Sequence, residues 1–156
     1  MHRHALAVVL ALAATVSLSA PVAAQSHRDV ITGQLNIAAS VMGREGFVAA
    51  GAMNGGEPII GLLPVGGIVF LEIELEADVA YVVTGACDAD CTDLDLTLVD
   101  EDGETLVEDM EIDDVPMLHF VAPRGARYML GVGMSDCSTE ACFFGFQVLR
   151  AGRPVS

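Results

Sequence analysis

Apolar and charged residues alternate along the second half of the chain, which predicts β-strands. In residues 69–76 every second position is apolar and the positions between are mostly glutamate, a period typical of a strand with one buried and one wet face. Segments of strand character follow at residues 79–86, 93–99, 104–108, 117–122, 127–134 and 143–149. Turn sequences separate them, such as Asp100-Glu101-Asp102-Gly103 and Pro123-Arg124-Gly125. Seven to eight short strands with turns between them predict an all-β antiparallel sandwich or barrel.

Two of these segments predict which strand faces are buried. Residues 79–86 are apolar on both faces, which predicts a central strand covered on both sides. In residues 143–149 the alternation puts Phe144 and Phe146 on one face, which we take as inward, and Phe143 on the other.

A helical period precedes the strands and predicts one short helix over residues 26–43. Ser26 and Asp29 resemble a capping box with Asp in place of Glu, and Gly43 is a plausible stop. We expect the apolar face of this helix to pack across the sandwich. That face consists of Val30, Ile31, Leu35, Ala38, Val41 and Met42.

The first 24 residues have the organisation of a cleavable secretory signal. A basic start, Met1-His2-Arg3-His4, is followed by an apolar run at residues 5–18 and by the small residues Val22-Ala23-Ala24. The run is shorter than the ~20 residues of a spanning helix, although a retained N-terminal anchor is the alternative. We predict cleavage after Ala24, then a helix and linker at 25–45, one sandwich domain at 46–150 and a tail at 151–156.

The charge balance is strongly acidic and excludes several partners. The chain contains 22 acidic residues and no lysine, with a formal charge of −15. Arg3 lies before the predicted cut and all acidic residues lie after it, so the remaining segment carries −16. Binding to nucleic acid or to anionic lipid depends on neutralising phosphates with Lys and Arg. We therefore expect no nucleic-acid partner. We also expect no membrane insertion once the signal is removed, because the longest later uncharged stretches, 30–43 and 58–71, are too short to span.

Four cysteines form two close pairs, Cys87 with Cys91 and Cys137 with Cys142. In an exported protein an even number of cysteines predicts disulfides, and a zinc site with four thiolates is the less favoured alternative. Three connectivities are possible. We favour the two local pairings, because each pair lies between consecutive predicted strands and would close one loop.

No catalytic motif is present. The segment after Ala24 has two histidines, His27 and His119, and neither lies in a recognisable nucleophile–base or metal-protease pattern. We predict that the protein is not an enzyme and has no catalytic residue. A hydrolase is the third-ranked interpretation.

One region resembles the bacterial pre-peptidase C-terminal domain family. Residues 93–103 read D-L-D-L-T-L-V-D-E-D-G, similar to the family pattern D-L-D-L-x-L-x-D-x-x-G. Residues 125–132 are similar to its G-x-Y-x-L-x-V strand, with one extra residue before the tyrosine. The resemblance covers about residues 59–149. It implies a jelly-roll-like sandwich and a non-catalytic accessory role, and some members bind calcium or insoluble polymers. The preceding helix and the cysteine pairs depart from the family.

The acidic residues cluster between Arg44 and Arg124, where the chain has no basic residue. Calcium takes six to eight oxygen ligands, which clustered loop aspartates can supply, although a solvated acidic face is the simpler interpretation. Calcium is thus a possible but not a required cofactor. The candidate ligands are Asp88, Asp90, Asp93, Asp95, Asp113 and Asp114.

Together these features predict a periplasmic or secreted β-sandwich of the accessory or interaction type, without enzyme activity. Its partner would be a protein or an extracellular polymer. The alternative function is a calcium-dependent module that binds a polymer or a cell surface.

The export prediction is tested by the intact mass of the protein recovered from the periplasm or medium. We expect the chain to begin at Gln25. A full-length product retained in the membrane would contradict both the signal and the compartment.

Overall fold

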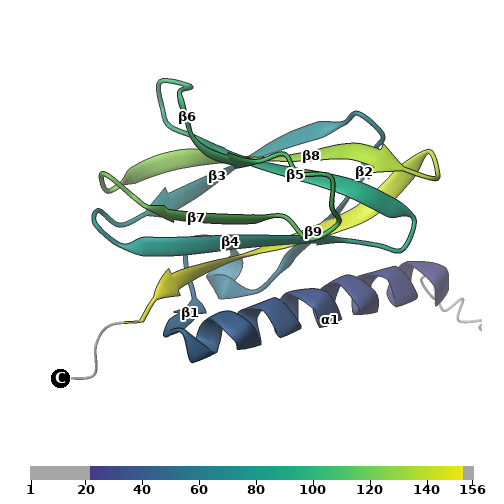
Figure 1. The fold of residues 1–156 in the computed structure, drawn as a ribbon, viewed down its shortest axis with the longest axis horizontal. Coiled ribbons are helices and arrows are strands. Elements are labelled where there is room, and N and C mark those ends of the chain that lie inside the picture. The colour runs from purple at the N-terminus through teal and green to yellow at the C-terminus, as the bar shows by residue number, and fades with distance from the viewer. Residues whose placement is uncertain (1–21, 153–156) are drawn as a thin grey trace, which may run out of the picture.

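Two antiparallel sheets form a sandwich with jelly-roll topology (Figure 1). The structure is a computed structural model and describes residues 22–152, with side chains from residue 26 onward. Within this range the larger sheet, sheet A, has the order β2-β9-β4-β7, with β1 also pairing with β9; the smaller, sheet B, has the order β3-β8-β5-β6. The strands are β1 (Phe47–Ala49), β2 (Ile59–Pro64), β3 (Ile68–Leu75), β4 (Ala80–Cys87), β5 (Cys91–Val99), β6 (Thr105–Asp109), β7 (Met117–Val121), β8 (Ala126–Cys137) and β9 (Ala141–Ala151).

The predicted all-β sandwich with a preceding helix is confirmed, with nine strands in the described residues in place of seven to eight. The seven segments recognised by their pattern correspond to β3–β9. The earlier strands β1 and β2 read F-V-A and I-I-G-L-L-P, so they lack the alternation of apolar and polar residues that marks β3 and β5. A short 3-10 turn, Asn54–Gly56, lies between them.

The main core lies between the two sheets. On β5 the predicted alternation holds, because Leu94, Leu96 and Leu98 are fully buried while the residues between them face outward. Phe144 and Phe146 of β9 also point into this core, as expected.

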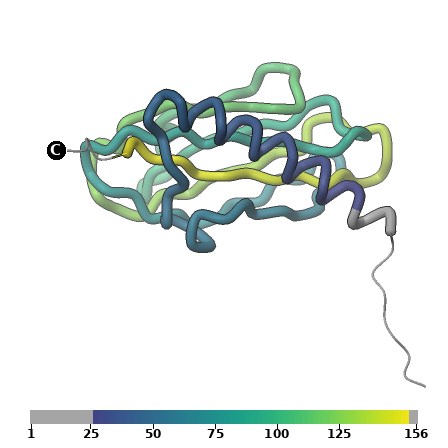
Figure 2. Tube along the Cα trace, turned by 90° about the horizontal axis from the view of Figure 1, so that it is seen from below, coloured from purple at the N-terminus to yellow at the C-terminus, as the bar shows by residue number. Residues whose placement is uncertain are grey.

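Helix α1 (Val22–Arg44) packs against the outer face of sheet A, along β9, β4 and β1 (Figure 2). It begins before the predicted start, so Ser26 and Asp29 lie inside the helix and do not cap it. Ile31, Leu35 and Met42 are fully or nearly fully buried against the sheet. Val30 and Val41, predicted for the same face, are 48% and 38% exposed, because a helix lying on a flat sheet buries only a narrow stripe. No helix within the described residues is both long and apolar enough to cross a membrane.

The helix approaches β9 most closely at Gly145. A Cβ atom placed there would lie 2.5 Å from Cγ2 of Ile31 and 3.1 Å from the carbonyl oxygen of Ile59. Glycine therefore sets the distance at which α1 can pack on the sheet.

We predict that Gly145→Ala lowers the free energy of unfolding by about 1–3 kcal/mol, because the added methyl group overpacks the helix–sheet contact. Chemical denaturation of the purified protein measures this. The matched control is Gly133→Ala on β8, where a Cβ has no neighbour closer than 3.5 Å. Equal loss of stability in both variants would show that the close approach of α1 is not the cause.

Candidate functional site

Two disulfides lie side by side at one end of the sandwich. Cys87 pairs with Cys91 and Cys137 pairs with Cys142, with Cα–Cα distances of 5.9 and 6.0 Å, which are the local pairings favoured from the sequence. Cys91 and Cys137 are also partners in the β5–β8 register, so the two loops are neighbours. None of the four cysteines is free for zinc. Two disulfides indicate that the protein folds in an oxidising compartment.

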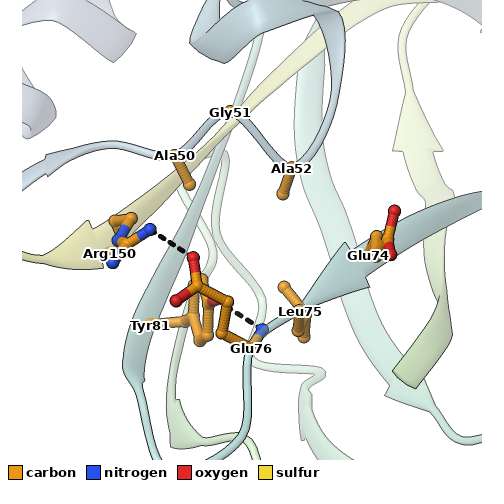
Figure 3. Close-up of a pocket in the computed structure, with 8 residues that line it drawn as sticks. All are labelled: Ala50, Gly51, Ala52, Glu74, Leu75, Glu76, Tyr81 and Arg150. Carbon is orange, nitrogen blue, oxygen red and sulfur yellow. Dashed lines mark hydrogen bonds and ion pairs between the residues drawn. The ribbon is translucent and has the colours of Figure 1, made fainter. Parts of the chain in front are cut away.

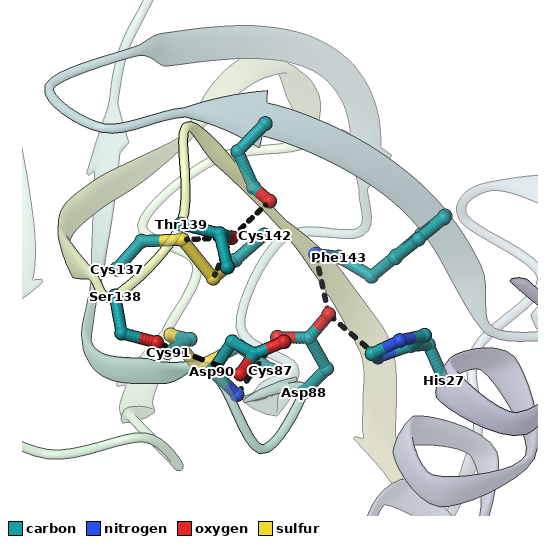
Figure 4. A network of polar contacts seen from close by, with 11 residues as sticks. His27, Cys87, Asp88, Asp90, Cys91, Cys137, Ser138, Thr139, Cys142 and Phe143 are labelled. Atoms are coloured by element: carbon teal, nitrogen blue, oxygen red, sulfur yellow. Dashed lines mark hydrogen bonds and ion pairs between the residues drawn. A yellow bond between two sulfur atoms is a disulfide. The ribbon is translucent and has the colours of Figure 1, made fainter. Parts of the chain in front are cut away.

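The short loop closed by the first disulfide holds a buried carboxylate, that of Asp88, which is only 3% exposed (Figure 4). Its Oδ2 accepts a hydrogen bond from the backbone N–H of Phe143 at 3.0 Å, and its Oδ1 accepts one from the N–H of Asp90 at 3.3 Å. A charge is tolerated away from water only when it is paired and hydrogen-bonded in this way. Asp88 therefore ties the β4–β5 loop to β9.

His27 approaches the same carboxylate from helix α1. Its Nδ1 lies 3.0 Å from Oδ2 of Asp88, and its ring stacks on Phe143 with the centroids 5.4 Å apart (Figure 4). Ligand atoms of His27, Asp88 and Asp90 all lie within 4.8 Å of one another. His27 was given no role in the sequence analysis. Nothing in its local sequence marks it, because the contact joins positions 61 residues apart through the docking of the helix.

The six aspartates predicted as calcium ligands form no single compact group of donors in the described residues, although Asp93, Asp95 and Asp113 are neighbours. Asp88 and Asp90 belong to the group with His27, the sole group of three such donors within 4.8 Å that the described residues form. Asp93 and Asp95 lie on β5, away from its leucines. Asp113 and Asp114 lie in the β6–β7 loop, where the Asp113 side chain accepts from the N–H of Val115 and Asp114 is exposed. A single six-ligand site is therefore not formed by these residues.

The Asp93 carboxylate is unusual among the acidic groups. Its Oδ1 is buried and has no hydrogen-bond partner. Burial raises the pKa of Asp93 above its ordinary value, and three nearby carboxylates raise it further, those of Asp95, Asp136 and Asp113. This end of sheet B is thus a place of concentrated negative charge.

An apolar trough lies beside it on the outer face of sheet B. Ile68 and Phe70 of β3 form one wall and are 64% and 51% exposed. Phe70 and Thr97 lean over Gly131 of β8, since a Cβ there would meet both at under 3 Å. Gly133, one pleat further along, stays open and forms part of the floor. The trough has a volume of about 130 Å³ and is also lined by Asp95, Met110 and Ser135.

A larger hollow of about 400 Å³ lies beside the ends of β3 and β9 (Figure 3). Two of its three charged groups are engaged with one another, since Arg150 is ion-paired with Glu76. The backbone N–H of Glu76 donates to the hydroxyl of Tyr81 at 2.9 Å. These contacts fasten the β3–β4 turn to β9, which is a structural role. His119, the other histidine considered from the sequence, is exposed on β7.

No protein-family model matches the chain, and no curated protein sequence matches it. The resemblance to the pre-peptidase C-terminal domain family stays a prediction, and function has to be argued from the geometry above.

We predict that Asp93→Asn stabilises the protein near neutral pH and raises its Tm. A carboxyl with a raised pKa in the folded state disfavours folding when it is ionised. This penalty is present above the folded pKa and disappears as the pH falls through it, so the advantage of the variant should shrink on acidification.

Thermal unfolding of both proteins between pH 7 and pH 4 measures the effect. Asp114→Asn is the control, because it removes the same charge from an exposed position. An equal gain in the control, or a gain that does not change with pH, would assign the effect to net charge alone.

Proposed function

We propose that the protein is exported to the periplasm or beyond and acts by binding, without catalysis. In this proposal the outer face of sheet B binds an extended, positively charged segment of a partner protein. The predicted signal and the two disulfides support the compartment. The resemblance to a family of accessory modules supports the absence of catalysis. The observation that carries the proposal is the apolar trough bordered by carboxylates.

Exposed apolar side chains are the first part of the argument. Helix α1 covers sheet A, and no described helix covers sheet B (Figure 1). Ile68, Phe70 and Met110 project from this uncovered side around the trough. A contiguous apolar patch rimmed by polar groups is typical of an interaction surface.

The size of the trough favours one side chain of a larger partner. Small-molecule sites commonly enclose roughly 300–1,000 Å³, whereas a cavity of ~150 Å³ holds one benzene molecule. The trough, at about 130 Å³, suits a single aliphatic or aromatic side chain. Its open ends leave room for the backbone that carries that side chain.

The charge around the trough favours a partner with basic residues next to its apolar anchor. Asp95 lines it, and Asp93 and Asp136 lie close to Asp95 in the paired strands β5 and β8. None of these three forms an ion pair with an arginine of the described residues. A partner that places Arg or Lys beside its apolar anchor would neutralise them, and such complementarity raises both association rate and specificity.

The test uses a displayed library of random peptides selected on the oxidised protein. We expect enrichment of an apolar residue flanked by Arg or Lys. The affinity of a selected peptide, measured by calorimetry, should fall at least about tenfold in Ile68→Asp, which corresponds to ~1.4 kcal/mol. It should fall similarly in Gly133→Val, which fills the floor of the trough.

Val121→Asp on β7 is the matched control, because Val121 is 59% exposed but lies in sheet A. Equal loss in this variant would contradict the assignment of the surface.

The second candidate function is a calcium-dependent binding module. The buried Oδ1 of Asp93 favours it, because this oxygen has no hydrogen-bond partner. Binding that requires calcium, and is lost in Asp93→Asn, would make the protein a calcium-dependent module instead.

A further inference from the structure

The donors beside helix α1 form a mixed set of one imidazole and two carboxylates. A ring nitrogen of His27 and carboxylate oxygens of Asp88 and Asp90 lie within 4.8 Å of one another, and Nδ1 is 3.0 Å from Oδ2 of Asp88 (Figure 4). Calcium and magnesium take oxygen ligands, whereas imidazole suits zinc, copper and nickel. The chemistry of this group therefore points to a transition metal and differs from the calcium predicted at Asp88 and Asp90.

The two carboxylates are held in place by the fold, and His27 lies beside them. Asp88 and Asp90 lie in the loop closed by the Cys87–Cys91 disulfide, and the His27 ring is held by stacking on Phe143. Within the described residues no arginine forms an ion pair with either aspartate. Ligands on rigid supports lose little conformational entropy when a metal binds.

A second, separate argument comes from the predicted processing site. Cleavage after Ala24 would make the chain begin Gln25-Ser26-His27, with a free α-amino group two residues before the histidine. The α-amine, the backbone nitrogens of Ser26 and His27, and Nδ1 of His27 can then close successive chelate rings around one ion. The predicted cut removes residues 22 and 23, which lie one helical turn before Ser26 and His27, so the helical hydrogen bonds to their carbonyls are removed with them.

We propose that the processed protein binds Cu(II) at its N-terminus, through the Gln25 α-amine, two backbone nitrogens and His27 Nδ1, with a carboxylate of Asp88 or Asp90 as a further ligand. Four nitrogens in a plane with a weaker oxygen suit the tetragonal geometry of Cu(II), which is also the strongest binder in the divalent series. The α-amine, where protonated, and both amides release their protons to solvent, and no electron is transferred. The inference rests on the proposed export.

Metal binding would rearrange only the first residues of the processed helix. The fully buried residues of α1 begin at Ile31, so the packing of the helix on sheet A does not depend on residues 25–27 keeping helical dihedral angles.

The experiment is a titration of the exported, oxidised protein with Cu(II) chloride in the presence of a glycine competitor. Binding is followed by visible circular dichroism and electron paramagnetic resonance. Intact mass first establishes the N-terminal residue. A Gln25→Ala protein is titrated in parallel, because an N-terminal glutamine can cyclise onto its own amine. We expect one ion per chain with a nitrogen-rich tetragonal spectrum, and no response to calcium.

The chain offers a selective block of the α-amine. Because it has no lysine, an amine-reactive acetylating reagent modifies the N-terminus alone. Acetylation and His27→Ala should each weaken Cu(II) binding at least about 100-fold, and Asp90→Asn about tenfold. Asp114→Asn is the control for loss of charge and should bind like the wild type.

Unchanged binding after acetylation, or in a folded His27→Ala protein, would overturn the site. A processed chain that does not begin at Gln25 would also overturn the site, because the α-amine would then not lie two residues before His27. Peptide binding at the trough does not involve His27, so it separates failure of this site from failure of the proposed function.

Discussion

The architecture depends on the fact that strands β4 and β9 are apolar on both faces. A sheet built on such strands needs a cover on its outer face, because the apolar side chains there would otherwise face water. Helix α1 supplies the missing layer with Ile31, Leu35 and Met42, and Gly145 lets it approach the sheet closely. Sheet B has the opposite character, since its outer face carries acidic residues and the exposed apolar residues around the trough. The molecule therefore has one covered side and one open side.

The docking of helix α1 on sheet A also produces the polar contact between His27 and Asp88 at the disulfide end. The helix passes over β9 and brings His27 against Asp88, whose carboxylate is already held by the backbone of β9 and by its own short loop. One buried carboxylate thus joins three elements that are distant in sequence. A polar cluster of this kind is sensitive to any change in the helix position, because hydrogen bonds to a charged group weaken steeply with distance and angle.

The open side concentrates negative charge around Asp93, where none of Asp93, Asp95 and Asp136 is ion-paired with an arginine of the described residues. The raised pKa of Asp93 reports the effect of burial and of the carboxylates around it. The same face exposes Ile68 and Phe70 beside the glycine floor of β8. Apolar surface combined with unbalanced charge is unfavourable for an isolated molecule and favourable for one that meets a complementary partner, which is the physical basis of the proposed function.

Local patterns in the sequence determined the all-β class and seven of the strands, because the strand period depends on residues close together in the chain. They favoured the local disulfide pairing but left the other two connectivities possible. They also predicted a helix, although not its start or the narrow stripe that it buries. Only the tertiary structure decided the remainder. It separated six aspartates predicted as one site, joined two of them to His27 and placed Gly131 and Gly133 beneath exposed apolar side chains. These juxtapositions depend on sheet order and helix docking, which bring together residues with no relation in sequence.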